Sequence, residues 1–208
     1  MLTVHAADAV HGAPAGADAV AVDGDTVAAI GPYGELLADR PRARVRRWSG
    51  LITPGLLNAG APALLEAAYH PDPREADELG TDPVTGAALA ALDLDEARRG
   101  ASARRGLQRM LRHGTTAVRG PFTRPAVRTA VARSGLRIHA PGPAPHPVGL
   151  DPLASVTAPD GAFAAALAVG GPADLAVFDV RDAAELRAAG AGSCTATVLG
   201  GRLLFRRG

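Results

Sequence analysis

The sequence predicts an α/β protein with β-structure at both ends of the chain and helices alternating with strands between them. Two observations carry this prediction. Short apolar runs separated by turn residues occupy both ends of the chain, which is typical of strands. From about residue 60 to 140, segments with a helical spacing of apolar residues alternate with short β-branched runs. Such alternation favours βαβ units with parallel strand pairing.

The N-terminal strands are expected at residues 2–5, 18–23 and 26–31. In AVAVDGDTVAAIG, apolar residues alternate with small ones on either side of Asp23-Gly24-Asp25, and an Asp-Gly pair between such runs predicts a hairpin. RARVRRWSGLITPG is expected to form one further strand that leads to the Pro54-Gly55 turn.

The central elements follow from helical spacing and glycine stops. APALLEAAYH (61–70) and LDLDEARRGASARRGLQRMLRHG (92–114) are predicted helices, and Gly114 suits the end of the second. The apolar stripe of that second helix is expected to comprise Ala97, Ala101, Leu107, Met110 and Leu111. TTAVRG is predicted as a buried strand, RPAVRTAVARSG as a helix stopped by Gly135, and LRIHAPG as another strand.

The C-terminal part begins after GPAPHPVGLDP, whose proline and glycine content indicates a linker or an irregular loop. ADLAVFDV (173–180) is a predicted strand, and CTATVLGGRLLFRRG is expected to form a closing hairpin turned at Gly200-Gly201. The sequence contains no internal repeat.

The composition excludes several classes of protein. With 208 residues, 47% hydrophobic and 21% charged, the chain is long enough and apolar enough to bury a core. A net charge of +1 gives no general attraction to nucleic acid or anionic lipid. One cysteine, Cys194, excludes an intramolecular disulfide and favours a reducing cytoplasm. No signal peptide or membrane span is recognised.

Four stretches, in the order LITPGLLNAG, MLRHGTTAVRG, GGPADLAVFDV and TATVLGGRLLFRRG, together with the AVAVDGDTVAAIG hairpin, resemble the amidohydrolase superfamily, particularly imidazolonepropionase and aminodeoxyfutalosine deaminase. The resemblance implies a composite β-sandwich built from both chain termini, with a metal-bearing (β/α)8 barrel inserted between them. It therefore implies a sandwich of residues 1–58 and 160–208 and a truncated, incomplete TIM-barrel-like α/β lobe of residues 59–159.

Two departures from the family pattern bear on the chemistry. Where the family has Asn-Ala-His-x-His, this chain has Asn58-Ala59 followed by Gly60, Ala61 and Pro62, so both ligand positions lack donor atoms. A catalytic zinc commonly needs three protein ligands and an open position. The lobe of about 100 residues is also too short for a barrel of ~250 residues. No cofactor or metal is therefore expected.

Several individual residues have competing interpretations. His139 ends a predicted parallel strand, where α/β proteins bind ligands, so it is a ligand contact or simply a polar strand end. With Asn58 and Arg119 it defines a possible remnant pocket, in which Arg119 pairs with an anion or lies in solvent. His70, with Asp72, Glu75 and Asp77, forms either a metal cluster or a solvated acidic loop. His113 suits the last turn of a helix, and Cys194 suits a buried thiol.

In the run RPRARVRRW (40–48), arginines alternate with Pro41, Ala43 and Val45, as on an edge strand with one solvent-exposed face. No nucleic acid is expected to bind there.

The favoured hypothesis for the whole chain is a pseudoenzyme with a structural or regulatory role. Its exposed strands would be covered by a second copy, most simply in a C2 homodimer, or by a partner protein. Two alternatives stay open: a metal-dependent hydrolase acting on non-peptide carbon–nitrogen bonds, whose zinc or other divalent metal other residues would hold, and a small-molecule binding module.

Overall fold

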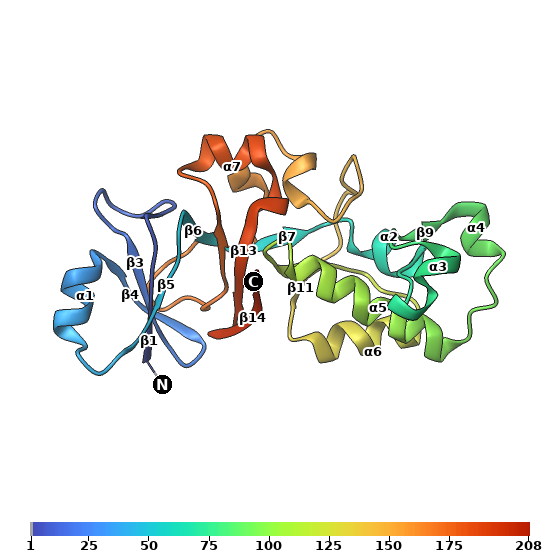
Figure 1. The fold of residues 1–208 in the computed structure, drawn as a ribbon, viewed down its shortest axis with the longest axis horizontal. Helices are drawn as coiled ribbons and strands as arrows, with labels where there is room; N and C mark the ends of the chain where they lie inside the picture. The colour runs from blue at the N-terminus through green and yellow to red at the C-terminus, as the bar shows by residue number, and fades with distance from the viewer. Residues whose placement is uncertain (1) are drawn as a thin grey trace.

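The computed structural model describes residues 2–208, which form a mixed α/β protein of elongated shape (Figure 1). The blue N-terminal strands lie at one end, the red C-terminal strands lie in the middle, and the green helical lobe lies at the other end (Figure 1). The described residues form sheets of four, three, five and two strands and no closed barrel.

The four-stranded sheet comes entirely from the N-terminal segment. Its order is β4-β3-β1-β5, with β1 at Leu2–Ala6, β3 at Ala19–Asp23, β4 at Thr26–Gly31 and β5 at Arg44–Arg47. The predicted hairpin is confirmed, since β3 and β4 pair antiparallel from Asp23 opposite Thr26, and Gly24 has a φ of 60°. Helix α1 (Tyr33–Asp39), which the sequence patterns did not predict, packs Leu36 against the outer face of this sheet.

The single strand expected for RARVRRWSGLITPG is two strands in two different sheets. β5 ends at Arg47, and β6 (Leu51–Pro54) belongs to the five-stranded sheet. Between them Gly50 has a φ of 87°, and a Cβ there would lie 2.1 Å from the carbonyl oxygen of Phe178. Glycine permits the chain to pass from one sheet to the other at this position.

The five-stranded sheet joins both ends of the chain, in the order β14-β13-β12-β6-β2. β2 (Ala9–Val10) and β6 precede the helical lobe, whereas β12 (Leu175–Phe178), β13 (Cys194–Leu199) and β14 (Arg202–Arg206) follow it. β6 pairs antiparallel with β12. The predicted final hairpin is confirmed, with φ values of 53° and 70° at Gly200 and Gly201. An apolar layer of Val20, Val22, Val27, Ile52, Leu175, Val177, Ala196 and Val198 fills the space between the two sheets.

The three-stranded sheet is parallel, in the order β11-β10-β7. β7 (Leu56–Asn58), β10 (Thr115–Arg119) and β11 (Arg137–His139) alternate with α2 (Ala61–Glu66), α5 (Glu96–Leu111) and α6 (Pro125–Ser134), which confirms the predicted helix–strand alternation. Gly135, with a φ of 79°, ends α6. The helices bury one face of β10, with Val118 in their shared core.

The buried face of α5 differs from the predicted stripe. Leu107 and Met110 are buried as expected, but Ala97 is exposed and Ala101 and Leu111 are only partly buried. The remaining buried residues of this helix are Gly100, Ser102, Ala103 and Gly106. Gly100 faces Ala126 of α6, and a Cβ at Gly106 would lie 2.7 Å from both His70 and Leu65. The buried face of α5 is therefore the one whose small residues let neighbouring segments approach the helix closely, and not the one with the largest apolar side chains.

Short elements complete the fold. The segment expected to be an acidic loop contains a 3₁₀ turn at Pro73–Glu75 and α3 (Ala76–Leu79), followed by α4 (Gly86–Ala90). β8 (Ala68–Tyr69) and β9 (Val84–Thr85) form the two-stranded sheet. After β11, 3₁₀ turns occur at Pro152–Ser155, Pro159–Ala162 and Ala191–Ser193, and α7 spans Ala183–Ala189.

Gly55 is the junction between the five-stranded sheet and the parallel sheet, because it alone separates β6 from β7. Its N–H donates to the Asp174 carbonyl (3.0 Å), and its carbonyl accepts from the Ala164 N–H (2.9 Å). A Cβ at this position would lie 2.0 Å from Oγ1 of the buried Thr116. Only glycine fits between the two sheets here.

Replacing Gly55 by alanine is therefore expected to lower the free energy of unfolding by about 1–3 kcal/mol, the range for overpacking a core. Gly34→Ala is the matched control, because Gly34 lies in α1 with no atom within 4 Å of an added Cβ. The control is expected to leave stability unchanged or to raise it slightly. Urea denaturation of both variants measures the difference, and equal midpoints would contradict the close approach at Gly55.

Candidate functional site

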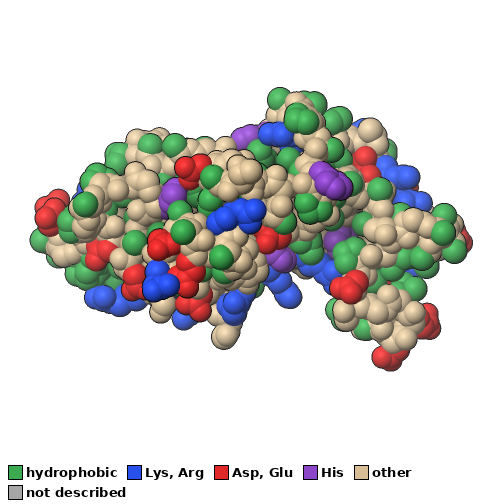
Figure 2. Space-filling view, turned by 90° about the horizontal axis from the view of Figure 1, so that it is seen from above, with side chains coloured by type: hydrophobic (Ala, Val, Ile, Leu, Met, Phe, Trp, Pro, Cys, Tyr) green, Lys and Arg blue, Asp and Glu red, His purple; other side chains and the backbone are tan. Residues whose placement is uncertain are grey.

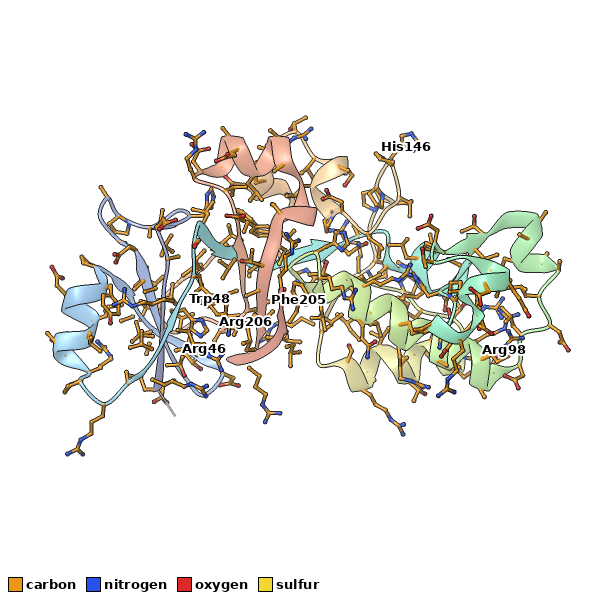
Figure 3. The ribbon with its side chains drawn as sticks, in the orientation of Figure 1. Arg46, Trp48, Arg98, His146, Phe205 and Arg206 are labelled. Atoms are coloured by element: carbon orange, nitrogen blue, oxygen red, sulfur yellow. The ribbon has the colours of Figure 1, made fainter. Side chains whose placement is uncertain are left out.

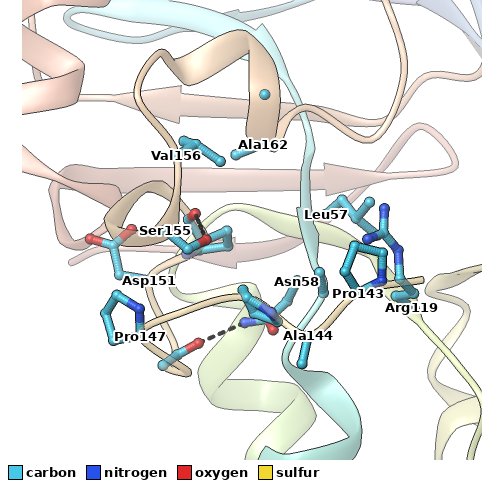
Figure 4. Close-up of a pocket in the computed structure, with 15 residues that line it drawn as sticks. Leu57, Asn58, Arg119, Pro143, Ala144, Pro147, Asp151, Ser155, Val156 and Ala162 are labelled. Carbon is cyan, nitrogen blue, oxygen red and sulfur yellow. Dashed lines mark hydrogen bonds between the residues drawn. The ribbon is translucent and has the colours of Figure 1, made fainter. Parts of the chain in front are cut away.

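A cavity of about 190 Å³ opens at the carboxyl ends of β7 and β10 (Figure 4). Asn58 is the last residue of β7 and Arg119 the last of β10, so parallel pairing brings them to the same edge of the sheet. The opposite wall comes from the proline-rich segment and the 3₁₀ turns that follow it, with Pro143, Pro145, Pro147, Asp151, Ser155 and Ala162. The carboxyl ends of parallel strands are where α/β folds commonly bind ligands.

Asn58 shapes this cavity rather than offering free hydrogen bonds. Its side chain is 2% exposed. Its Oδ1 accepts from the Gly60 N–H (2.9 Å), and its Nδ2 donates to the Gly149 carbonyl (3.0 Å). The amide therefore ties the start of α2 to the proline-rich segment and holds one wall of the cavity in place.

Arg119 carries the available charge. Its half-buried side chain packs against Gly142, where a Cβ would lie 3.0 Å from Nη1. Within residues 2–208 its guanidinium has neither an ion pair nor a hydrogen bond. Asp151, the other charged residue of the wall, already accepts from the N–H groups of Leu153 (2.8 Å) and Ala191 (3.0 Å). The cavity thus presents an unpaired cation suited to a carboxylate.

His139 lies next to Arg119 in the register of β10 and β11 but faces a different space. It lines a small neighbouring cavity of about 20 Å³ with Arg137 and Asp174. Of the three residues predicted to share a pocket, the structure therefore brings Asn58 and Arg119 together and places His139 beside them.

The residues around the cavity do not fit a catalytic zinc. Gly60 is the N-cap of α2 and Pro62 lies in its first turn, and neither has a donor side chain. The oxygens of Asn58 and Asp151 already accept from the backbone. No group of three or more His, Cys, Asp or Glu side chains in the described part of the chain is placed to hold a metal ion.

The hypothetical cluster around His70 does not form, and the solvated-loop interpretation is also wrong for part of it. His70 is fully buried, with Nε2 against the Leu64 carbonyl (2.9 Å), and burial lowers the pKa of its imidazole. Glu75 accepts from the N–H of Asp72 and from the Tyr69 hydroxyl and pairs with Arg98 (2.8 Å). These contacts, the Asp72 N–H first, lower the pKa of Glu75 to about 2.

Other titratable groups have structural roles. His113 Nδ1 contacts the Arg109 carbonyl (3.0 Å) at the end of α5. Burial raises the pKa of the Cys194 thiol to about 11, as expected of an unreactive cysteine.

His5 is a buried histidine of the four-stranded sheet. It is 1% exposed and accepts at Nδ1 from the Trp48 Nε1–H (3.2 Å). Burial and then the charge of Arg46 lower its pKa to about 4.

One pair was missed by sequence reasoning. His11 Nε2 lies 2.7 Å from an Asp160 carboxylate oxygen, at a cavity of about 360 Å³ walled by Pro54, Phe163 and Leu167. The partners are 149 positions apart. No local spacing or motif signals such a contact.

Comparisons with known proteins give partial likenesses. No family model and no curated protein matches the sequence. The structure is similar to A. niger ochratoxinase (18% identity, 67% of this chain and 30% of that chain, TM-score 0.44). It is also similar to E. coli guanine deaminase (17%, 67% and 35%, TM-score 0.44). A third similar structure is an amidohydrolase from an environmental sample of the Sargasso Sea (22%, 67% and 33%, TM-score 0.42).

The chain spans about a third of the length of these structures. At such identities and TM-scores the likeness assigns neither an activity nor a ligand to this chain. Separately, no helix within residues 2–208 combines the length and the apolar character that crossing a bilayer requires.

The low pKa of His5 predicts a pH dependence of stability. Between pH 6.5 and about 4 the unfolded chain binds a proton at this imidazole that the folded protein does not bind. The free energy of unfolding is therefore expected to fall as the pH decreases through this window. His5→Asn, which keeps an acceptor for Trp48, is expected to show a shallower decrease in chemical denaturation at a series of pH values. The exposed His146 serves as the control, since His146→Asn should keep the wild-type slope. Equal slopes for all three proteins would contradict the prediction.

Proposed function

We propose that this chain is an amidohydrolase-like protein without hydrolase activity, and that it binds a small carboxylate at Arg119 in a structural or regulatory role. The observation that carries the proposal is the unpaired guanidinium of Arg119 in a walled cavity at the carboxyl ends of parallel strands. A planar guanidinium fork matches a carboxylate in two parallel hydrogen bonds.

The dimensions of the cavity support a small ligand. Its volume of about 190 Å³ is below the ~300–1,000 Å³ typical of sites for drug-sized molecules. The walls of Pro143, Pro145 and Pro147 are apolar and conformationally restricted. A mono- or dicarboxylate of a few carbon atoms is therefore the proposed class of ligand.

The lack of a donor set at Gly60 and Pro62 supports the absence of hydrolase chemistry, because neither side chain can coordinate a metal. The hydrolase alternative, acting on non-peptide carbon–nitrogen bonds, would need metal ligands from other residues.

We further propose a cytoplasmic location, since the one thiol of the chain is buried and unpaired.

We also propose that a second copy of the chain covers the open edge of the parallel sheet. β11 is the outer strand of that sheet, and its Ile138 is 57% exposed. The other edge, β7, is already covered by a bridge from Leu56 to Phe163. A two-fold axis at β11 would pair it with its own copy and remove the exposed edge.

Arg119→Gln tests the binding site. The wild-type protein is expected to show a thermal shift with a small mono- or dicarboxylate such as acetate or malonate, and the variant to bind about 10- to 100-fold more weakly, as loss of a charged hydrogen bond predicts. Arg187→Gln removes one exposed arginine of α7 and should bind like the wild type. Equal loss in both variants, or stoichiometric zinc, iron or manganese in the purified protein, would overturn the proposal.

Ile138→Arg tests the proposed dimer. Light scattering of the wild-type protein is expected to give twice the mass of one chain, and the variant should give the mass of one chain because a charge would be buried at the two-fold axis. Val169→Arg changes another exposed apolar residue, 62% exposed, and should remain dimeric. A monomeric wild-type protein would contradict self-association.

A further inference from the structure

The two sheets of the sandwich bring arginines together at adjoining edges. β5 is the outer strand of the four-stranded sheet and β14 the outer strand of the five-stranded sheet. Arg46 lies opposite His5 in the parallel register, and His5 lies opposite Val20, which faces the apolar layer between the sheets. Arg46, and Arg44 two positions before it, therefore leave β5 on the face turned towards the other sheet.

Arg206 reaches the same place from the opposite sheet. It lies opposite Ala196, which also faces the apolar layer. Its guanidinium carbon is 5.7 Å from the ring centre of Trp48, and Figure 3 shows Arg46, Trp48 and Arg206 side by side. Because stacked sheets are about 10 Å apart, side chains as long as arginine can reach across the gap from both sides. We call Arg44, Arg46 and Arg206 the arginine slot.

The charges of the arginine slot are not compensated. None of its three guanidinium groups has an ion pair or a hydrogen bond to the residues that the structure describes. Burial first, and then the charges of Arg44 and Arg206, lower the pKa of Arg46. Other arginines, in contrast, do pair with carboxylates, as Arg98 does with Glu75 and Arg137 with Asp174.

Protection of an edge strand accounts for only part of this arrangement. Charged residues on edge strands prevent pairing with other chains, which explains arginines on β5. It does not explain why a third arginine approaches them from the opposite sheet, since like charges destabilise the folded state. The face in Figure 2, by contrast, shows basic and acidic side chains interspersed. Arg44 and Arg206 are exposed and Arg46 is half-buried, so an anion bound at the solvent edge where the two sheets adjoin would remove the repulsion.

We propose that the arginine slot binds the phosphate group of a small molecule. Three cations that converge from two sheets suit a tetrahedral dianion, whose oxygens point in several directions, better than a planar carboxylate, which is satisfied by a single fork. Nucleic acid is not the proposed ligand. The half-buried indole of Trp48 stacks on His5 and contacts Arg206, so it forms a wall of the slot rather than an exposed platform for bases.

Trp48 provides a direct measurement, because it is the only tryptophan of the chain. Titration with inorganic phosphate, at an ionic strength held constant with chloride, is expected to change its fluorescence and to raise the melting temperature. Glycerol phosphate in a parallel titration distinguishes a phosphate ester from the free anion, and saturation by either one supports the proposal.

Single substitutions distinguish phosphate binding at the arginine slot from non-specific attraction of phosphate to surface arginines. Arg46→Gln and Arg206→Gln are expected to bind phosphate at least about tenfold more weakly, as loss of a charged contact predicts. In chloride alone their melting temperatures should equal or exceed that of the wild type, because repulsion is removed. Arg202→Gln, which removes an exposed arginine from the same strand, should respond like the wild type. Arg119→Gln should do the same, which keeps this proposal independent of the carboxylate cavity.

Three results would overturn the proposal. The first is an unchanged Trp48 signal with both phosphate compounds. The second is an equal loss of response in Arg202→Gln, which would indicate charge without a site. The third is tight binding of a single-stranded oligonucleotide without any response to phosphate compounds. Circular dichroism of each variant establishes that it is folded.

Discussion

The contacts of Asp174 hold the parallel sheet against the sandwich. This residue precedes β12 and is 7% exposed. Its Oδ1 accepts from the Gly200 N–H in the final hairpin (2.7 Å), its Oδ2 accepts from the Arg137 guanidinium of β11, and its carbonyl accepts from Gly55 (3.0 Å). One buried carboxylate residue therefore connects the last hairpin, the outermost parallel strand and the junction between the sheets. Without this carboxylate the Gly200 N–H and the Arg137 guanidinium would lose their acceptor, and loss of a hydrogen bond to a charged group is costly.

The junction at Gly55 also explains where the cavity forms. Because Gly55 packs directly on Thr116, β7 continues from β6 and lies beside β10, so that Asn58 and Arg119 end at one edge. A full barrel would continue with further strands beyond β11. Here the chain instead returns through residues 143–167, which pack Leu153, Ala162 and Phe163 against Leu56. This segment fills the space beside β7 and supplies the proline wall of the cavity, but it leaves the edge of β11 open.

All 22 basic residues of this chain are arginines, and they differ in what surrounds them. Several arginines stabilise the fold by pairing with carboxylates or backbone carbonyls, as Arg105 does with Asp72 and with the His70 carbonyl. Arg119 and the arginine slot differ in position, because Arg119 lines a cavity and the slot lies where the edges of two sheets adjoin. Fold alone does not determine function, and here the groups that could recognise a ligand lie where the fold leaves charge uncompensated. The two sites also differ in the number of cations: Arg119 offers one guanidinium group, whereas the arginine slot has three arginines that come from two sheets.

The sequence by itself determined the elements whose signals are local. Gly24, Gly200 and Gly201 occur where hairpins need a positive φ, and Gly135 ends α6. Only the tertiary structure decided that the chain changes sheet at Gly50, that small residues select the buried face of α5, and that His139 is separated from the Arg119 cavity. The same holds for the contact of Arg206 with Trp48 and of His11 with Asp160. Turns and helix ends depend on the conformations open to a few neighbouring residues. These contacts depend instead on how sheets distant in sequence pack together, which no local spacing encodes.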